Sequence, residues 1–290
     1  MHEIIHEIFL HGILDTLYVI PFLFLTYLLM EFIEHKASDK AVGFMHKAGM
    51  FGPLAGGALG AVPQCGFPSV ASNLYCGRVI SLGTLVAVFL SCSDEMLPIM
   101  ISSALGVKTI VGVLVYKVTA AVIAGFAVDI ILHLFNKKTP KIDIDELCEN
   151  DNCHCERGIF YSALHHTASI TLFILLFTFI INALVFVIGE ESLGKIMYDK
   201  PLISHLIAAI FGLIPNCAAS VALTGFYTDG FITLGTMLSG LFSGSGIGLL
   251  VLFKVNKHPK ENLAIIALLV FSGFLFGLLA DVTGLSALLT

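Results

Sequence analysis

The stretch GAVPQCGFP at residues 60–68 has a counterpart in GLIPNCAAS at residues 212–220, an offset of 152 positions. Both stretches place a proline two residues before a cysteine inside a long apolar segment. The offset holds without a gap for about 70 residues, so that Asp129, for example, is matched by Asp281. A duplicated apolar unit with helix breakers at matched positions is typical of secondary transporters whose site lies where the repeats meet.

The composition is that of a membrane protein. Hydrophobic residues make up 57% of the chain, charged residues only 12%, and the mean hydropathy is +0.94. A soluble domain carries about 25% charged residues. The apolar residues fall in long blocks, which indicates a polytopic protein whose main partner is the lipid bilayer. We expect no nucleic-acid partner.

Each half follows the same plan of span, broken segment, interrupted span and span. The expected segments are 13–32, 51–76, 79–105 and 109–135 in the first half, and 164–188, 202–227, 231–253 and 263–285 in the second. We therefore divide the chain into a first transmembrane repeat at 1–135, an acidic loop at 136–160 that is expected in the cytoplasm, and a second transmembrane repeat at 161–290.

Lysine and arginine decide how the broken segments enter the membrane. Of the 15 such residues, Lys117 lies within a span, and re-entrant hairpins would divide the other fourteen eleven against three. Full crossings would give the weaker division of nine against five, so the positive-inside rule favours hairpins. Each hairpin arm would be roughly 18 Å long, too short to cross. The predicted fold is an all-α polytopic membrane protein with two inverted repeats of five hydrophobic helices, each with a broken or re-entrant hairpin and an interrupted helix.

The hairpin tips combine backbone breaks with ligand-type side chains. A broken backbone is tolerated at membrane depth only where protein or a watery cavity satisfies its polar groups. The breaks are expected at Pro63, Gly66, Pro68 and Pro215. The residues beside them are candidate substrate or metal ligands: Gln64, Cys65, Asn216 and Cys217. The alternative interpretation is that the two cysteines are small packing residues.

The interrupted spans carry a second group of candidate ligands. Asp94 and Glu95 fall within an apolar segment, where a carboxylate is expensive and usually functional, as a cation ligand or a proton carrier. Serine hydroxyls and one thiol could complete the set: Ser91, Cys92, Ser93, Ser243 and Ser245. Alternatively, the helix ends early and the two acids are interfacial.

Asp129 and Asp281 lie at matched positions near the ends of the last spans. As carboxylates in apolar helices they are candidates for proton or ion coupling. The alternative is that they cap helices or bind Lys117 or a loop.

Two further motifs lie outside the spans. Cys148, Cys153, His154 and Cys155 fall within one acidic loop and could capture a soft metal, although a solvated linker is the alternative. His2-Glu3-Ile4-Ile5-His6 matches the HExxH pattern of metalloproteases, but no third ligand follows it. An intramembrane metalloenzyme is thus a remote alternative.

The paired Pro-x-Cys elements at Pro63-Gln64-Cys65 and Pro215-Asn216-Cys217 resemble those of the bacterial ten-helix heavy-metal exporters, which are labelled arsenic efflux proteins or manganese transporters. The resemblance covers nearly the whole chain. It implies ten helices and the export of a metal or metalloid.

We therefore expect a secondary-active transporter of the bacterial inner membrane, not an enzyme, that exports an arsenical, manganese or another divalent metal through a site at the repeat interface. Cysteine sulfur favours soft ions, whereas carboxylate and hydroxyl oxygens favour manganese. The ion is cargo and no cofactor is required, with protons or sodium as coupling ions and a homodimer as one assembly. An organic-anion carrier or channel of similar fold is the main alternative.

Overall fold

The computed structural model describes residues 51–63, 66–93, 96–134, 201–215 and 217–289, with scattered residues at 20–28 and 160–176. Every regular element in these ranges is a helix. The expected first span at 13–32, the fifth at 164–188 and the loop at 136–160 lie wholly or largely outside the described residues.

Each predicted broken segment forms two short helices. In the first half they are α3 (Gly52–Gly60) and α4 (Gly66–Cys76), and in the second α11 (Pro201–Gly212) and α12 (Cys217–Thr228). The breaks therefore fall at the matched prolines Pro63 and Pro215, because proline cannot continue the hydrogen-bond ladder of a helix. The breaks expected at Gly66 and Pro68 are wrong, since both residues lie in the first turn of α4, where a proline needs no intrahelical N–H partner.

Each predicted interrupted span is also two helices. They are α5 (Leu82–Ser91) and α6 (Met96–Ser102) in the first half, and α13 (Leu234–Ser243) and α14 (Gly248–Val255) in the second. The first helix of each pair begins with a side-chain cap, which satisfies a backbone N–H that has no partner inside the helix. The caps are Ser81 and Thr233, each accepting from a backbone nitrogen at 3.1 Å.

The last span of each half is one long apolar helix. α7 runs over Val107–Leu134 and α15 over Pro259–Val282, followed by the short α16 (Leu285–Leu289). By length and apolar composition, four segments of the described chain can cross a membrane: α7, α15, 82–102 and 234–255. The chain is thus an all-helical polytopic membrane protein, as the sequence predicts.

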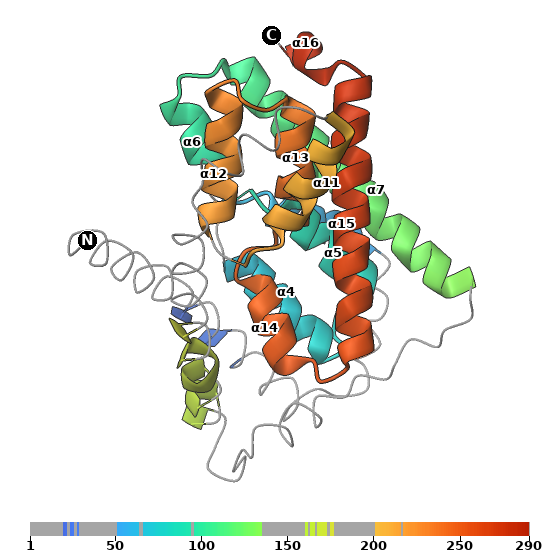
Figure 1. Ribbon diagram of the computed structural model, residues 1–290. Helices are drawn as coiled ribbons and strands as arrows, with labels where there is room; N and C mark the ends of the chain where they lie inside the picture. The colour runs from blue at the N-terminus through green and yellow to red at the C-terminus, as the bar shows by residue number, and fades with distance from the viewer. Residues whose placement is uncertain are drawn as a thin grey trace, which may run out of the picture.

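The interrupted helices occupy the centre of the molecule. Almost every residue of α5 and all of α13 are buried, whereas α7 and α15 bury about a third of their apolar stretches. In the first half α3 and α7 pack on α5, and in the second α11 and α15 pack on α13 (Figure 1). Equivalent helices therefore make equivalent contacts in the two halves.

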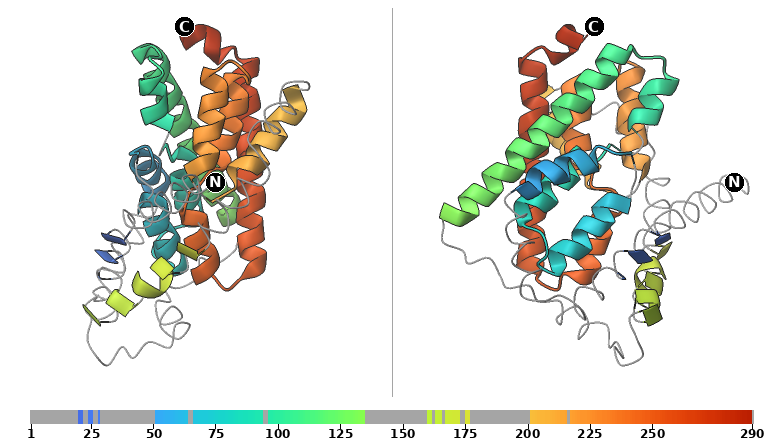
Figure 2. Two further views of the ribbon diagram at one scale, coloured as in Figure 1. Left: turned by 60° about the vertical axis from the view of Figure 1, so that its left-hand side comes forward. Right: turned by 180° about the vertical axis from the view of Figure 1, so that it is seen from behind.

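The second arm of each hairpin also packs on the other half. α4 lies beside α14, and α12 lies beside α6, as the views from front and back show (Figures 1 and 2). The larger hydrophobic core is shared accordingly, since Met96 and Met100 of α6 are buried in one cluster with Ala219 and Leu223 of α12. The two halves therefore exchange arms across their interface.

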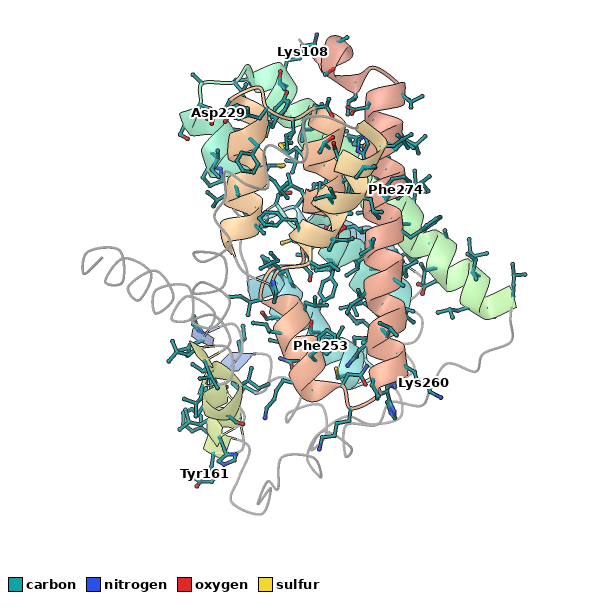
Figure 3. All side chains as sticks on the ribbon, viewed as in Figure 1. Lys108, Tyr161, Asp229, Phe253, Lys260 and Phe274 are labelled. Atoms are coloured by element: carbon teal, nitrogen blue, oxygen red, sulfur yellow. The ribbon has the colours of Figure 1, made fainter. Side chains whose placement is uncertain are left out.

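The matched long helices run in opposite directions. Lys108, at the start of α7, lies at the end of the molecule where α15 finishes, whereas Lys260, at the start of α15, lies at the opposite end (Figure 3). Both outer ends of the first hairpin lie near the N-terminus of α5, because Gly52 packs against Thr84 and the chain passes from α4 into α5 through a short turn at 77–81.

Candidate functional site

The end of each first hairpin arm meets the break of its own half. A Cβ on Gly60, the last residue of α3, would lie 2.2 Å from Ser91 Oγ and 2.5 Å from the Val88 carbonyl oxygen. At the matched position, a Cβ on Gly212 would lie 2.0 Å from the Gly240 carbonyl oxygen. Only glycine allows such a close approach of two backbones.

The first hairpin also reaches the break of the other half. A Cβ on Gly248, the first residue of α14, would lie 2.6 Å from Pro68 Cβ, and Ser72 Oγ donates to the Gly248 carbonyl at 2.7 Å. In the second hairpin, α12 packs on α6, the helix that follows the break of the first half. The two hairpin ends and the two helix breaks therefore come together in one region at the interface of the halves.

The described residues of the break in the first half are buried, and a lysine contacts them. Ser91, Cys92 and Ser93 are all 5% exposed or less. The serine hydroxyls donate to nearby backbone, Ser91 to Ala87 at 2.8 Å and Ser93 to Ser91 at 2.9 Å. Lys117 of α7 is 0% exposed, and its Nζ donates to the Cys92 carbonyl. The Lys117 amino group lies at the C-terminal end of α5, where the helix dipole favours a positive charge.

The break in the second half is built differently. Its Ser243 donates to the Ser239 carbonyl at 3.1 Å, as Ser91 does in the first half. Ser245, however, is 2% exposed, and among the described residues its Oγ has no hydrogen-bond partner. The next residue is Gly246 at φ +51°, a backbone conformation that favours glycine. An unpaired buried hydroxyl costs about 1–3 kcal/mol, so Ser245 is a group that a bound water or ion would satisfy.

Asp129 and Asp281 cap the interrupted helices in the same way. Asp129 accepts from the Gly83 nitrogen at 2.8 Å and from Ser81 Oγ at 2.7 Å. Asp281 accepts from the Gly235 nitrogen at 2.8 Å and from Thr233 Oγ1. The structure thus gives both carboxylates the capping contacts that the sequence analysis named as the alternative to coupling.

The second half adds a histidine to this cap. His205 of α11 is 1% exposed, with its Nε2 3.3 Å from Asp281 Oδ2 and its Nδ1 2.9 Å from Ser239 Oγ. The matched positions in the first half are Pro53 and Ala87, so the first cap has no equivalent of either group.

An ion pair ties the two halves at the end of the molecule where α15 begins. Arg78, just after α4, donates to Glu261 of α15 at 2.9 and 3.3 Å, and Tyr75 Oη donates to the same carboxylate. The arginine carbon Cζ lies 5.5 Å from the centre of the Tyr75 ring. The hydrogen bonds to Glu261 raise the pKa of Arg78, which therefore stays charged.

Several predicted site residues lie outside the described residues, and their surroundings are not assigned: Gln64, Cys65, Asp94, Glu95, Cys148, Cys153, His154, Cys155 and Asn216. Cys217 is the first residue of α12. Within the described ranges, no three His, Cys, Asp or Glu side chains are grouped so that they could hold a metal ion. The geometry available for the site is therefore that of the breaks and of the residues flanking them.

Comparison with known proteins identifies the family of the chain. A family model described as "Putative, 10TM heavy-metal exporter" matches residues 5–192 of the 290, well over half of the chain. The chain belongs to this family. No curated protein and no solved structure matched it.

Membership in this heavy-metal exporter family confirms the resemblance inferred from the Pro-x-Cys elements. The matched segment contains the first hairpin and the first helix break, with Pro63, Ser91 and Lys117. Three features of this family member were missed from its sequence: the contact of Lys117 with the break, the His205 pair and the Arg78–Glu261 ion pair. The sequence did carry one signal for these features. Each of these residues is matched by a different residue type at the equivalent position of the other repeat.

Proposed function

We propose that this protein is a secondary-active transporter that exports a heavy metal or metalloid through a site at the interface of its two halves. The observation that carries the proposal is the meeting of two hairpin ends and two helix breaks in one buried region. Broken helices expose backbone carbonyls and N–H groups that can replace the water shell of an ion, and transporters use them for that purpose.

The two halves, in this proposal, are inverted repeats with re-entrant hairpins. The opposite directions of α7 and α15 support the inversion (Figure 3). The return of both arms of the first hairpin toward the N-terminus of α5 supports re-entry. The basic loops would face the cytoplasm of a bacterial cell, with the protein in the inner membrane.

Two donor sets are available for the cargo. Cys65 and Cys217, at matched hairpin positions, would offer soft sulfur to an arsenical, zinc or cadmium ion. Asp94 and Glu95 would offer harder oxygen to manganese. The remaining proposed ligands flank these positions: Gln64, Ser91, Cys92, Ser93, Asn216, Ser243 and Ser245. The unpaired hydroxyl of Ser245 supports placing the cargo against the second break.

The cargo is moved and not chemically changed, so the proposal assigns no catalytic residue and no resident cofactor. Protons or sodium would drive export. The Cys148–Cys155 loop would capture metal on the cytoplasmic side before it enters the site.

The proposal is tested by growth and accumulation in a metal-sensitive bacterial strain challenged with manganese, zinc, cadmium, arsenite and a methylarsenical. The wild type is compared with the Cys65→Ser/Cys217→Ser double variant and with Asp94→Asn. Cys76→Ser is the matched control, since it makes the same chemical change at a cysteine at the end of α4 and away from the hairpin tip.

Lower accumulation of one metal, lost in the double variant but kept in Cys76→Ser, would support a soft site. Loss in Asp94→Asn alone would indicate an oxygen site and manganese. Unchanged accumulation of all five probes in wild-type cells would contradict the proposal.

A second candidate is an organic-anion carrier, favoured by one observation. Lys117 places a buried amino group at the first break. Uptake of labelled carboxylates into vesicles that contain the purified protein separates the two functions, because a metal exporter would leave these anions outside.

A further inference from the structure

His205 is a buried titratable group that the proposed site does not use. It lies on α11 with 1% of its surface exposed. The ring of Phe274 on α15, labelled in Figure 3, is perpendicular to the imidazole, and the two ring centres are 6.4 Å apart. Ionisable side chains in such surroundings are expensive, and in transporters they commonly carry protons.

The hydrogen bonds around His205 are best satisfied when the imidazole is doubly protonated. Asp281 already accepts from the Gly235 nitrogen and from Thr233 Oγ1, so it is a carboxylate that needs a donor from His205 Nε2. Ser239 Oγ lies 2.9 Å from His205 Nδ1 and 3.0 Å from the Gly235 carbonyl oxygen.

The serine hydrogen can serve only one of these two acceptors. With the extra proton on His205, Nδ1 donates to Ser239, and Ser239 donates to Gly235. Without it, Nε2 must keep the ring's one hydrogen for Asp281, and Ser239 must turn its hydrogen from the Gly235 carbonyl toward Nδ1. The proton-loaded network therefore contains one more hydrogen bond than the proton-free network.

No second charge in the described surroundings competes for this proton. Among the described residues of α11, α13 and α15, the only other titratable side chains are Asp281, which faces His205, and Lys260 and Glu261, at the far end of α15. On α12 and the turn that follows it, the titratable side chains are Cys217, Tyr227 and the exposed Asp229, which lies at the end of the molecule (Figure 3). The Asp281 carboxylate is thus the group that sets the charge facing His205.

The first half shows that the cap works without a histidine. Asp129 makes the same two contacts with Ser81 and Gly83. Its neighbours at the positions of His205 and Ser239 are Pro53 and Ala87. The histidine is therefore an addition to one half, and capping alone does not explain it.

The pair is mechanically connected to the second break. Asp281 caps the start of α13, and the other end of α13 leads into Ser245. His205 lies on the hairpin arm α11, whose last residue, Gly212, packs against Gly240 near the end of α13. A change of charge at the pair therefore acts on α13, which ends at this break, and on α11, which packs beside it.

We propose that His205, paired with Asp281, is the binding site for a coupling proton. Imidazolium holds α11 against α13 and α15 through the contact with the carboxylate. When Nδ1–H transfers its proton to water, the site loses one positive charge and one hydrogen bond, and α11 is released to move. This inference rests on the proposed transport function and names its driving ion.

The first test reads the protonation state without any cargo. The full-length protein, labelled with ¹⁵N-histidine and held in nanodiscs, is followed by NMR across a series of pH values, because the ¹⁵N shifts distinguish the doubly protonated ring from the neutral ring. The His205→Gln variant assigns the signal. We expect the doubly protonated ring to give way to the neutral ring as the pH is raised. A ring that stays in one form throughout would overturn the proposal.

The second test uses proteoliposomes with Mn²⁺ and arsenite as separate probes. His205→Gln should keep exchange of the probe across the membrane without a pH gradient, while stimulation by a gradient falls from several-fold to none. His133→Gln, at an exposed histidine of α7, is the matched control and should keep both. Stimulation that persists in His205→Gln, or exchange that is lost together with it, would overturn the coupling role.

The two failures are distinguishable. If the wild type moves neither probe, the proposed cargo is wrong, and the NMR titration alone decides whether His205 binds a proton. His205→Gln leaves the contacts of Asp281 with Gly235 and Thr233 in place, so the cap of α13 is kept and the variant is expected to fold.

Discussion

At the scale of single residues, the two breaks differ in whether a buried serine hydroxyl has a hydrogen-bond partner. Ser93 and Ser245 are matched and both are buried, yet only Ser93 has a hydrogen-bond partner among the described residues. Two hydroxyls at equivalent positions thus have opposite effects on stability, which makes them a natural pair for comparison.

Ser245→Ala removes an unpaired polar group, so we expect the free energy of unfolding to rise by about 1 kcal/mol while metal transport falls. Ser93→Ala removes a hydrogen bond and should lower the free energy of unfolding by about 1 kcal/mol. Unfolding of both variants in detergent checks the signs. Destabilisation by both changes would mean that Ser245 is paired in the folded protein.

Lys117 gives the second prediction at this scale. Lys117→Met keeps the apolar stem but removes the donor to the Cys92 carbonyl, so the break is left with an unsatisfied buried acceptor. We expect the free energy of unfolding to fall by about 1–3 kcal/mol. Lys108→Met on the same helix is the control, because Lys108 is exposed. Equal thermal unfolding of the two variants would contradict a structural role for the buried ammonium.

At the scale of helices, glycines set how closely the hairpin arms approach the interrupted helices. Gly60 faces the Val88 carbonyl at a distance that no Cβ tolerates, whereas Gly225 of α12 has nothing within 4 Å of its Cβ position. The same substitution should therefore have opposite consequences on the two helices.

Gly60→Ala should separate α3 from α5 and destabilise the protein by about 1–3 kcal/mol. Gly225→Ala should stabilise it by about 0.5–1 kcal/mol, because alanine loses less backbone entropy in a helix. Denaturation of purified protein measures both. An unchanged stability in Gly60→Ala would show that α3 can move away from α5 freely.

The sequence predicts where the helices break better than it predicts the contacts between helices. The offset of 152 placed the breaks at Pro63 and Pro215 and the carboxylates at Asp129 and Asp281, because local geometry is repeated when sequence is repeated. It could not predict the partners of Lys117 or His205. Those contacts join elements that are distant in the chain. They also occur at positions where the two repeats differ, so comparing the repeats does not predict them.

At the scale of the whole molecule, the halves are held together by polar contacts as well as by apolar packing. Arg78 and Glu261 join the end of α4 to the start of α15, and Tyr116 Oη donates to the Phe276 carbonyl at 2.6 Å between α7 and α15. The ion pair is partly exposed, with side chains 16% and 27% accessible.

Charge reversal tests how much this ion pair contributes. Arg78→Glu and Glu261→Arg should each lower thermal stability by juxtaposing like charges, and the double variant should recover part of the loss. Because the pair is partly exposed, we expect a coupling energy of only about 0.5–1 kcal/mol. Additive losses in the double variant would mean that the two charges do not interact in the membrane-embedded protein.

The exchange of arms between halves has a consequence for the origin of the protein. Each break is lined by both halves, since α4 packs on α14, and α12 packs on α6 as well as on its own α13. Under the proposed inversion, a half-length ancestor would need two chains inserted in opposite orientations to build either break. Fusion of the two copies would fix one in each orientation and leave each half free to carry a residue that the other lacks, as with Lys117 and His205.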